Sequence, residues 1–517
     1  MNKKVSTLLA SVFIIAICGI LYELLISTIT SYFQGSSILH FSIVIGLFLS
    51  FMGIGSYASK FIKDDLPVWF VRFELVLSFV GGFSAFLLYF AFSLTPYFYG
   101  VAFVLIAILG AMIGIEIPIL TRIIGKYDSL KDAIANVLSF DYLGALIASV
   151  AFPLLLLPVF GNMRTAFAIG LLNLIVAVLN TYLFKSELKK FKQFIIAEAA
   201  IGIILIVGFI YSFQINAYYE TFLYRDDVML SRQTKYQNIV VTRWNKDMRL
   251  FINGNLQFSS RDEYRYHEPL VHVPMSLTGF HDKVLILGGG DGMAVRELLK
   301  YDDIGSIELV DLDPVITDLA KNHPAFVKLN ENAMNHEKVQ IFNTDAFKYI
   351  ENSSDFYNVI IIDLPDPSNE SLGKLYSREF YSLIKKRLAA DGVVVSQSTS
   401  PYFAPDAFWC IHNTMDTVFQ TTLAYNTYVP SFGEWGFNMS LSETSRIPLA
   451  SHHADSIIQK IEQQLTKNKI ECSYLSAEML PSLFQFGEDR KKRSTPINKL
   501  DNQLLIQLYE KNWNEMR

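Results

Sequence analysis

The sequence predicts an α-helical multi-pass membrane domain followed by an α/β domain with a parallel, doubly wound sheet. Residues 1–216 consist mainly of long apolar runs, whereas the rest of the 517-residue chain has the mixed composition of a globular domain. Short apolar segments at 284–287, 306–310, 339–342, 359–362 and 393–396 alternate with helical segments, as in parallel sheets covered by helices on both faces. We therefore divide the chain into a membrane domain (1–216), a small β subdomain (217–275), the sheet domain (276–450) and a charged, helical C-terminal extension (451–517).

Seven apolar runs in the membrane domain are each long enough to cross about 30 Å of hydrocarbon. They lie at 8–27, 38–59, 68–94, 98–120, 133–160, 164–184 and 194–215. Lysine and arginine gather in alternate loops, at 3–4, 60–63, 122–131 and 185–192. The positive-inside rule therefore places the N-terminus in the cytoplasm, and seven crossings would leave the soluble half outside.

Four acidic residues interrupt the apolar runs: Glu23, Glu74, Glu116 and Asp141. An ionised group in hydrocarbon is costly unless it faces a partner or a cavity, so we expect these side chains to point into the bundle. Two interpretations stay open, namely a path for a cation or an amine and pairing within a purely structural bundle.

The charge of the two halves narrows the class of ligand. Residues 1–216 hold 13 Lys and Arg against 10 Asp and Glu, whereas residues 217–517 hold 31 against 39. An acidic soluble half argues against nucleic-acid binding and is compatible with a cationic substrate. The three cysteines, Cys18, Cys410 and Cys472, form no metal-binding spacing, so they indicate neither a zinc site nor a disulfide framework.

The β subdomain is predicted from strand-like segments at 239–242, 249–252 and 256–258. Asn253-Gly254 separates the last two, and this dipeptide is a strong signal for a two-residue hairpin turn.

The stretch 284–300 is typical of a buried strand, a glycine turn and a helix. Gly288, Gly289 and Gly290 allow the backbone to approach a ligand closely, and the helix N-terminus that follows offers unpaired N–H groups. Asp291 in this turn would repel a phosphate but accept a hydroxyl, an amine or a sulfonium group. The turn therefore predicts a site for a nucleoside without phosphates.

Acidic residues also follow two other strands of the predicted sheet. Asp311 ends the second strand about 20 residues after the turn, where nucleotide-binding folds hold ribose hydroxyls. Asp363 and Asp366 follow the fourth strand in the sequence DLPDP, at the edge of the sheet where ligands bind in such folds. One could hold an ammonium group while the other accepts a proton as a general base. Beside the other strand-end acids, this pair favours a binding site over simple N-cap and turn roles.

From about residue 230 to 440 the chain resembles the polyamine aminopropyltransferases, the family of spermidine synthase. The resemblance rests on YQNIVV (236–241), NGNLQFSSRDEYRYHE (253–268), LILGGGDGMAVRELLK (285–300), ELVDLDP (308–314), TDAF (344–347), DLPDP (363–367), LYSREFY (375–381) and WGF (435–437). It implies a Rossmann-like, methyltransferase-type sheet with a small preceding β subdomain. The apolar N-terminal region is similar to the membrane-fused branch of the family.

The resemblance implies transfer of an aminopropyl group from decarboxylated S-adenosylmethionine to a polyamine acceptor, with release of methylthioadenosine. The expected reaction converts putrescine to spermidine, and the donor is a co-substrate rather than a permanently bound cofactor. The resemblance also implies no metal, because the sulfonium already supplies the leaving group. Asp363 matches the proton-accepting acid. The amine or donor chain would be bound by Tyr266, His267, Asp291, Asp363 and Asp366. The nucleoside site would comprise Gln237, Gln257, Gly288, Gly289, Gly290, Asp291, Asp311 at the ribose, Asp345 at the adenine amino group, and Ala346.

Two departures from the family pattern leave the identity of the amine open. Leu364-Pro365 and Ser368-Asn369-Glu370 stand where the family usually has Ser or Thr and then Gly-Pro. Phe432 occupies a position where the family often has a tyrosine.

Two other classes of function remain as alternatives. An S-adenosylmethionine-dependent methyltransferase would share the sheet, the glycine turn and the ribose acid. A non-catalytic polyamine sensor or transporter would only bind the amine.

The protein is expected in the cell membrane, with an amine, the lipid bilayer and, in a homo-oligomer, a second copy of the chain as partners. Because the donor is cationic and made in the cytosol, we expect a cytoplasmic catalytic domain. That placement requires an even number of crossings, with one run, 68–94 or 133–160, re-entrant or miscounted.

Overall fold

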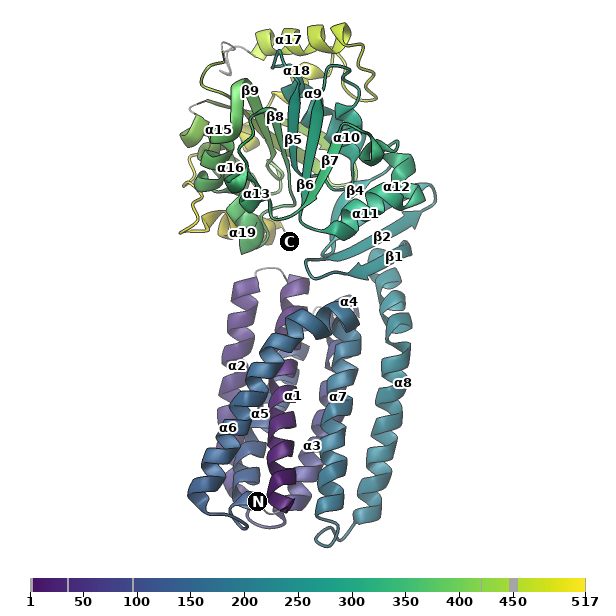
Figure 1. Cartoon of the computed structure of the whole chain (residues 1–517), viewed down its shortest axis with the longest axis vertical. Coiled ribbons are helices and arrows are strands. Elements are labelled where there is room, and N and C mark those ends of the chain that lie inside the picture. Colours follow the sequence, from purple (N-terminus) through teal and green to yellow (C-terminus); the bar gives the residue numbers. More distant parts are fainter. Residues whose placement is uncertain (1–2, 35–36, 95–96, 420, 446–453, 517) are drawn as a thin grey trace. The chain divides into compact units, whose positions relative to one another are not determined.

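The computed structural model describes residues 3–34, 37–94, 97–419, 421–445 and 454–516. The chain forms two compact units, Met1–Lys235 and Tyr236–Arg517, which Figure 1 colours along the sequence. The first unit extends beyond residue 216 because the helix α8 (Phe191–Tyr224) and the strand β1 (Asp227–Gln233) continue it.

The first unit is a bundle of long helices. They are α1 (Lys3–Gln34), α2 (Ser37–Ala58), α3 (Leu66–Gly82), α4 (Ser84–Leu94), α5 (Phe98–Ile124), α6 (Leu130–Ala151), α7 (Leu157–Leu183) and α8. Within the described residues, five helical stretches are long and apolar enough to cross a membrane, and α3 with α4, bent by 40°, would make a sixth. One of the five, Leu130–Leu183, contains α6 and α7 and has a non-helical residue at Gly161, where φ is +67° and ψ is 179°. The predicted runs 133–160 and 164–184 are thus separate helices.

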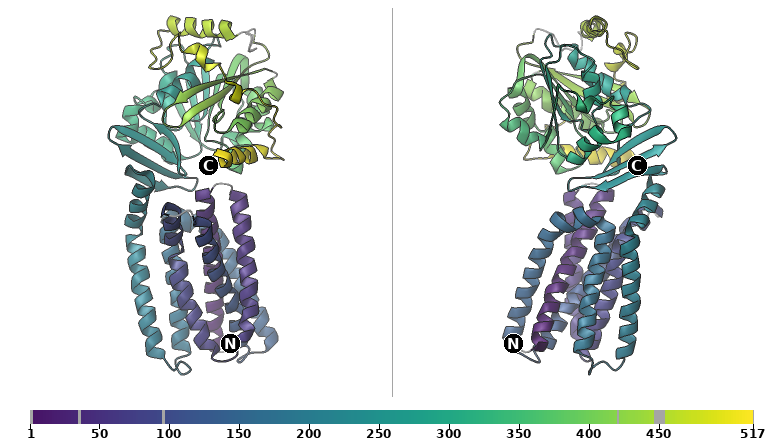
Figure 2. Two further views of the ribbon diagram at one scale, coloured as in Figure 1. Left: turned by 180° about the vertical axis from the view of Figure 1, so that it is seen from behind. Right: turned by 45° about the vertical axis from the view of Figure 1, so that its right-hand side comes forward.

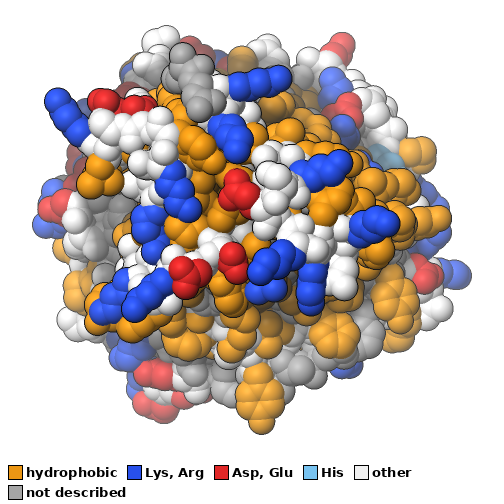
Figure 3. All heavy atoms as spheres, turned by 90° about the horizontal axis from the view of Figure 1, so that it is seen from below, with side chains coloured by type: hydrophobic (Ala, Val, Ile, Leu, Met, Phe, Trp, Pro, Cys, Tyr) orange, Lys and Arg blue, Asp and Glu red, His pale blue; other side chains and the backbone are white. Residues whose placement is uncertain are grey.

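One end of the bundle carries the lysine-rich loops. Lys4 Nζ donates to Tyr127 Oη at 3.4 Å and lies 3.9 Å from the Glu187 carboxylate. The Arg122 guanidinium donates to the backbone carbonyls of Ser59 and Ile62, at 2.9 and 2.8 Å. These contacts gather the N-terminus and three loops at the same end. Figure 3 looks onto this end and shows Lys and Arg side chains spread among apolar ones.

Aromatic side chains mark the other end of the bundle. Phe33, late in α1, packs against Tyr89 of α4 with ring centroids 5.0 Å apart, and Tyr89 packs against Tyr219 of α8 at 4.8 Å. The helix α8 therefore starts after the lysine-rich loops and finishes at the aromatic end. The N-terminus and the end of α8 lie at opposite ends of the bundle. The bent pair α3 and α4 is either one broken span or a re-entrant loop, so the expected re-entrant or miscounted run at 68–94 or 133–160 stays a prediction.

The acids predicted to point into the bundle do so in three cases. Glu74 and Glu116 are fully buried side by side, and Glu23 is buried on α1. Glu74 Oε2 accepts a hydrogen bond from Asn173 Nδ2 at 2.7 Å, whereas Asp141 is half-buried. A cation path and structural pairing both stay predictions for this group.

The second unit begins with an antiparallel meander and a helix. Its strands are β2 (Asn238–Trp244), β3 (Asp247–Ile252) and β4 (Asn255–Ser259), followed by α9 (Tyr264–Met275). The predicted hairpin turn is confirmed, with φ of 49° at Asn253 and 81° at Gly254. The left-handed conformation at both positions is the one that a type I′ turn requires.

A seven-stranded sheet forms the centre of the second unit, in the order β10-β11-β9-β8-β5-β6-β7. The five strands predicted from sequence are its parallel part: β5 (Lys283–Gly288), β6 (Ser306–Asp311), β7 (Val339–Asn343), β8 (Tyr357–Asp363) and β9 (Leu388–Gln397). The strand order reverses between β5 and β8, which is where ligands bind in doubly wound sheets. The antiparallel strands β10 (Thr422–Val429) and β11 (Gly433–Leu441) extend the sheet beyond that prediction.

Helices cover both faces of the sheet (Figures 1 and 2). They are α10 (Met293–Leu298), α11 (Pro314–Asn322), α12 (Pro324–Leu329), α13 (Ala346–Asn352), α14 (Glu370–Gly373), α15 (Arg378–Arg387) and α16 (Pro405–Phe419). Alternate residues of β5 point to opposite faces of the sheet. Val284 and Ile286 belong to one core cluster, and Leu285 and Leu287 belong to the other. Burial on both faces explains the continuous apolar run.

The C-terminal extension is only partly helical. It contains α17 (Ala454–Lys467), α18 (Leu480–Leu483) and α19 (Leu504–Met516), joined by long irregular segments. Buried hydrogen bonds attach one of these segments to the rest of the second unit. The Glu268 carboxylate accepts hydrogen bonds from the backbone N–H groups of Ser473, Tyr474 and Leu475, at 2.6, 2.9 and 2.9 Å.

Glu268→Ala is expected to lower the apparent melting temperature of the detergent-purified chain by several degrees, because three buried N–H groups would lose their acceptor. Thermal unfolding followed by tryptophan fluorescence measures the shift. Glu471→Ala, an exposed acid in the same region, is the control and should leave the melting temperature unchanged. Equal melting temperatures for wild type and Glu268→Ala would contradict the assigned anchoring role.

Candidate active site

The glycine turn lies directly against the end of strand β8. Gly288 is in register with Asp363, and a Cβ atom on Gly288 would come within 2.0 Å of the Asp363 carbonyl oxygen. Gly288 also has φ of +90°, and Gly289 N–H donates to that carbonyl at 3.0 Å. Only glycine fits at position 288, because the glycine turn lies so close to the end of β8 and the backbone at this residue is left-handed.

The acid at the end of β6 holds the next part of the turn. Asp311 Oδ2 accepts from Gly290 N–H at 3.2 Å, and Asp311 Oδ1 accepts from Asp313 N–H at 2.9 Å. Burial raises the pKa of Asp311 to about 6, with the neighbouring acids Asp313 and Asp291 adding to the rise and the two N–H donors opposing it. Asp311 is thus placed beside the turn, as predicted for a ribose-binding acid.

Asp363 stands at the switch point of the sheet. Its Oδ1 atom accepts a hydrogen bond from Tyr266 Oη at 2.5 Å. Burial raises the pKa of Asp363 to about 6, while a cationic His267 opposes this rise and Asp291 adds to it. Asp291, whose Oδ1 accepts from Met293 N–H at 2.9 Å, also has its pKa raised by burial. The structure therefore brings Tyr266, His267, Asp291 and Asp363 together.

His267 is held as a cation by a buried ion-pair chain. Its Nδ1 atom lies 2.7 Å from Glu263 Oε2, and Glu263 Oε1 in turn accepts from Arg296 Nη1 at 2.9 Å. Burial disfavours the imidazolium, but the hydrogen bond and the charge of Glu263 raise the pKa of His267 to about 9. A protonated His267 balances the charge of nearby acids instead of attracting another cation.

Asp366 is fixed by two hydroxyl groups. Its Oδ2 atom accepts from Tyr509 Oη at 2.8 Å and from Thr399 Oγ1 at 3.2 Å. Burial raises the pKa of Asp366 to about 6, and the two hydroxyl donors together with the Gln397 side-chain amide oppose the rise.

Comparison with known proteins identifies the family. The model of the spermine/spermidine synthase domain matches residues 263–451. The polyamine aminopropyltransferase of Leptospira interrogans is 43% identical over 513 residues, which cover 99% of both chains. That of Mycobacterium tuberculosis is 33% identical over 524 residues, covering 98% of this chain and 96% of the relative. The chain belongs to the polyamine aminopropyltransferase family.

A crystal structure of spermidine synthase in complex with the transition-state analogue AdoDATO is also similar to this polyamine aminopropyltransferase family member. The two are 25% identical, with a TM-score of 0.45. The match covers 50% of this chain and 85% of that chain.

In this aminopropyltransferase, Asp345 lies at the edge of the site. Thr344 N–H donates to the Asp311 carbonyl at 3.1 Å, which brings the ends of β6 and β7 side by side. Asp345 Oδ1 caps α13 by accepting from Phe347 N–H, and Oδ2 lies 2.6 Å from Lys374 Nζ. The pKa of Asp345 is lowered because Lys374 and the helix N–H groups outweigh the effect of burial. Ala346, buried, begins α13.

The two glutamines predicted for the nucleoside site come from the β meander. Gln257 Nε2 donates to the carbonyl of Asn255 in its own strand, at 3.1 Å. Gln237 stands directly before β2. For both, a role at the nucleoside stays a prediction.

Several residues that shape the site were not predicted: Glu263, Arg296, Lys374, Thr399 and Tyr509. For Glu263 alone a local signal exists, because its spacing of four residues from His267 places both on the same side of a helical turn. The other four each contact a partner between 29 and 143 residues away in the sequence, so no local pattern marks them.

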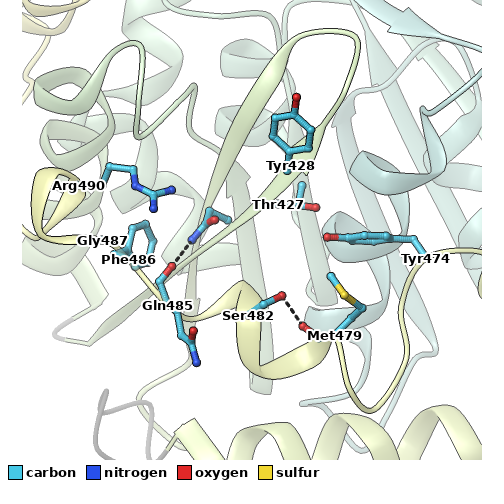
Figure 4. Close-up of a pocket in the computed structure, with 10 residues that line it drawn as sticks. Thr427, Tyr428, Tyr474, Met479, Ser482, Gln485, Phe486, Gly487 and Arg490 are labelled. Atoms are coloured by element: carbon cyan, nitrogen blue, oxygen red, sulfur yellow. Dashed lines mark hydrogen bonds between the residues drawn. The ribbon is translucent and has the colours of Figure 1, made fainter.

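A pocket of about 490 Å³ lies beside β10 (Figure 4). Its lining comes from β10 and from residues 474–490, including Tyr428, Tyr474 and Arg490. None of the predicted site residues lines this pocket.

Glu263→Gln should lower the pKa of His267 well below its value of about 9, because a buried imidazolium would lose its anionic partner. The measurement is an NMR titration of the protein carrying ¹⁵N-labelled histidine, with His267→Asn to assign the signal. Glu337→Gln, at an exposed acid, is the control. A His267 pKa that stays near 9 in Glu263→Gln would refute the ion-pair chain.

Proposed function

We propose that this chain transfers the aminopropyl group of decarboxylated S-adenosylmethionine to putrescine, releasing methylthioadenosine and spermidine. The observation that carries the proposal is the position of Asp363. It lies where the strand order reverses, directly against the glycine turn, and accepts a hydrogen bond from the Tyr266 hydroxyl. Family membership supports the reaction type, and the resemblance of the DLPDP segment supports the role of Asp363.

The chemistry requires a free amine, because an ammonium group has no lone pair. Asp363, with a pKa of about 6, is ionised at neutral pH and can accept one proton from the amine. The amine nitrogen then forms a bond to the carbon next to the sulfonium sulfur. The carbon–sulfur bond breaks with its electron pair moving to sulfur, which leaves as a neutral thioether.

The glycine turn and Asp311 support binding of the nucleoside part of the donor. A turn without side chains lets the nucleoside approach the sheet, and Asp311 can accept hydrogen bonds from ribose hydroxyls. Asp291 and Asp363 provide negative charge for a sulfonium and an amine. Tyr266 and His267 complete the proposed amine and donor-chain site, and Asp345, Ala346, Gln237 and Gln257 complete the proposed nucleoside site.

The paired acids Asp363 and Asp366 favour an amine acceptor over methyl transfer. Of the residues described above, a methyltransferase would need only those of the nucleoside pocket. The two acids after β8 are instead suited to binding the two amino groups of a diamine. A protein that only senses or transports the amine would need no general base, and so would keep its function without Asp363.

Asp363→Asn is expected to reduce aminopropyl transfer by about 10²-fold or more, because the amide keeps the shape but cannot take the proton. Transfer is measured with labelled donor, and methylthioadenosine affinity, measured by calorimetry, should stay within a few fold of wild type. In the wild type, transfer should fall as the pH drops through about 6, where Asp363 becomes protonated.

Asp355→Asn, an exposed acid after α13, is the matched control and should transfer normally. Near wild-type turnover by Asp363→Asn at neutral pH would refute Asp363 as the base.

We further propose that the protein lies in the cell membrane, that it forms a homo-oligomer, and that the catalytic unit is cytoplasmic. The apolar helices support the membrane, and the need for a donor made in the cytosol supports the cytoplasmic side. The lysine-rich loops also favour a cytoplasmic N-terminus, so both placements hold together only with an even number of crossings.

Cysteines placed at Lys491 and Lys190, both exposed, test the placement in a background lacking Cys18, Cys410 and Cys472. An impermeant maleimide should leave Lys491→Cys unlabelled in intact cells and should label both cysteines in permeabilised cells. Labelling of Lys491→Cys in intact cells would place the catalytic unit outside and require an external source of donor. Because the candidate span in α8 lies between the two positions, Lys190→Cys should be labelled in intact cells. Equal labelling of both in intact cells would contradict a crossing by α8.

A further inference from the structure

We propose that Tyr509 of the C-terminal helix α19 positions Asp366 for the amine, so that the C-terminal extension forms part of the acceptor site. This inference rests on the proposed function, since it names a residue that sets amine binding in that reaction.

The hydrogen bonds of Asp366 leave one of its oxygens for a ligand. Tyr509 Oη and Thr399 Oγ1 both donate to Oδ2. Oδ1 is buried and has no hydrogen-bond partner among the described residues. A buried carboxylate oxygen without a donor is costly, and an ammonium group would supply the missing donor. Two donors on the same oxygen fix the orientation of the other.

Thr399 is held in a conformation that its side chain disfavours. Its φ is +61°, which is a true outlier for a β-branched residue. Thr399 N–H donates to Gln397 Oε1 at 3.0 Å, and Gly436 N–H donates to the Thr399 carbonyl at 2.8 Å. Such strain persists where the surrounding structure imposes it, which is common at functional sites. Here the conformation aims the hydroxyl at Asp366.

The helix α19 is docked firmly enough to place the Tyr509 hydroxyl. Leu505 is fully buried, and Trp513 stacks on Phe403 with ring centroids 5.5 Å apart and planes 11° apart. Asn512 exchanges two hydrogen bonds with Asp406 at the start of α16, at 3.0 and 3.2 Å. A side chain on a helix fixed in this way is pre-organised, which is what precise positioning requires.

The same helix also supports the segment that follows the two acids. A Cβ atom added to Gly373, the last residue of α14, would lie 3.0 Å from Ile506. Tyr376 follows α14 in the sequence, and its hydroxyl donates to the carbonyls of Leu364 and Pro365 at 3.2 and 3.0 Å. The DLPDP turn is therefore braced on one side by Tyr376 and on the other by Tyr509.

Tyr509→Phe tests the proposal, because it removes the hydroxyl and keeps the ring that packs in α19. The KM for putrescine should rise about ten-fold, as expected for losing a hydrogen bond to a charged group, with kcat changed far less. The affinity for methylthioadenosine and the melting temperature should match wild type. Tyr428→Phe, at an exposed hydroxyl, is the control and should behave as wild type.

A double-mutant cycle separates positioning from a general structural role. If Tyr509 acts through Asp366, Tyr509→Phe should add little to the KM of Asp366→Asn. An unchanged KM in Tyr509→Phe, or equal effects in both backgrounds, would overturn the inference. An inactive wild type would instead overturn the proposed function, so the two failures are distinguishable.

Discussion

The site depends on one close approach between two neighbouring parallel strands. Gly288 and Gly289 pass the end of β8 closely enough for Gly289 N–H to bond the Asp363 carbonyl at 3.0 Å. This contact places the glycine turn and the proposed base in fixed positions, since both belong to buried strands. Every other group, from Asp311 to Tyr266, is arranged around that pair. A larger residue at position 288 would therefore disturb the proposed nucleoside and amine sites together.

The second constraint is electrostatic. Asp291, Asp311, Asp363 and Asp366 all have raised pKa values because each is buried near other acids or apolar groups. His267 is kept cationic by its ion-pair chain, and its positive charge offsets part of the electrostatic repulsion among these acids. A cationic donor and an amine would relieve the remainder on binding. The site thus suits positively charged reactants while staying stable without them.

Local patterns in the sequence predicted the parts of the structure that local physics decides. The apolar run of β5, the glycine turn and the Asn253-Gly254 hairpin each depend on a few adjacent residues, and all are present. Tyr509 could not be predicted, because its partner Asp366 is 143 residues away and α19 looks like an ordinary amphipathic helix. The seven apolar runs were read directly from the sequence, whereas the expected even number of crossings came from an argument about donor supply and stays a prediction.

The most direct test of the proposed reaction is the choice of donor by the purified full-length enzyme. Wild-type chain would be incubated with putrescine and either decarboxylated S-adenosylmethionine or S-adenosylmethionine, with both products of each reaction identified by mass spectrometry. We predict spermidine and methylthioadenosine from the decarboxylated donor, and no transfer from S-adenosylmethionine. Methylated product with S-adenosylhomocysteine, or no transfer from either donor, would contradict the account.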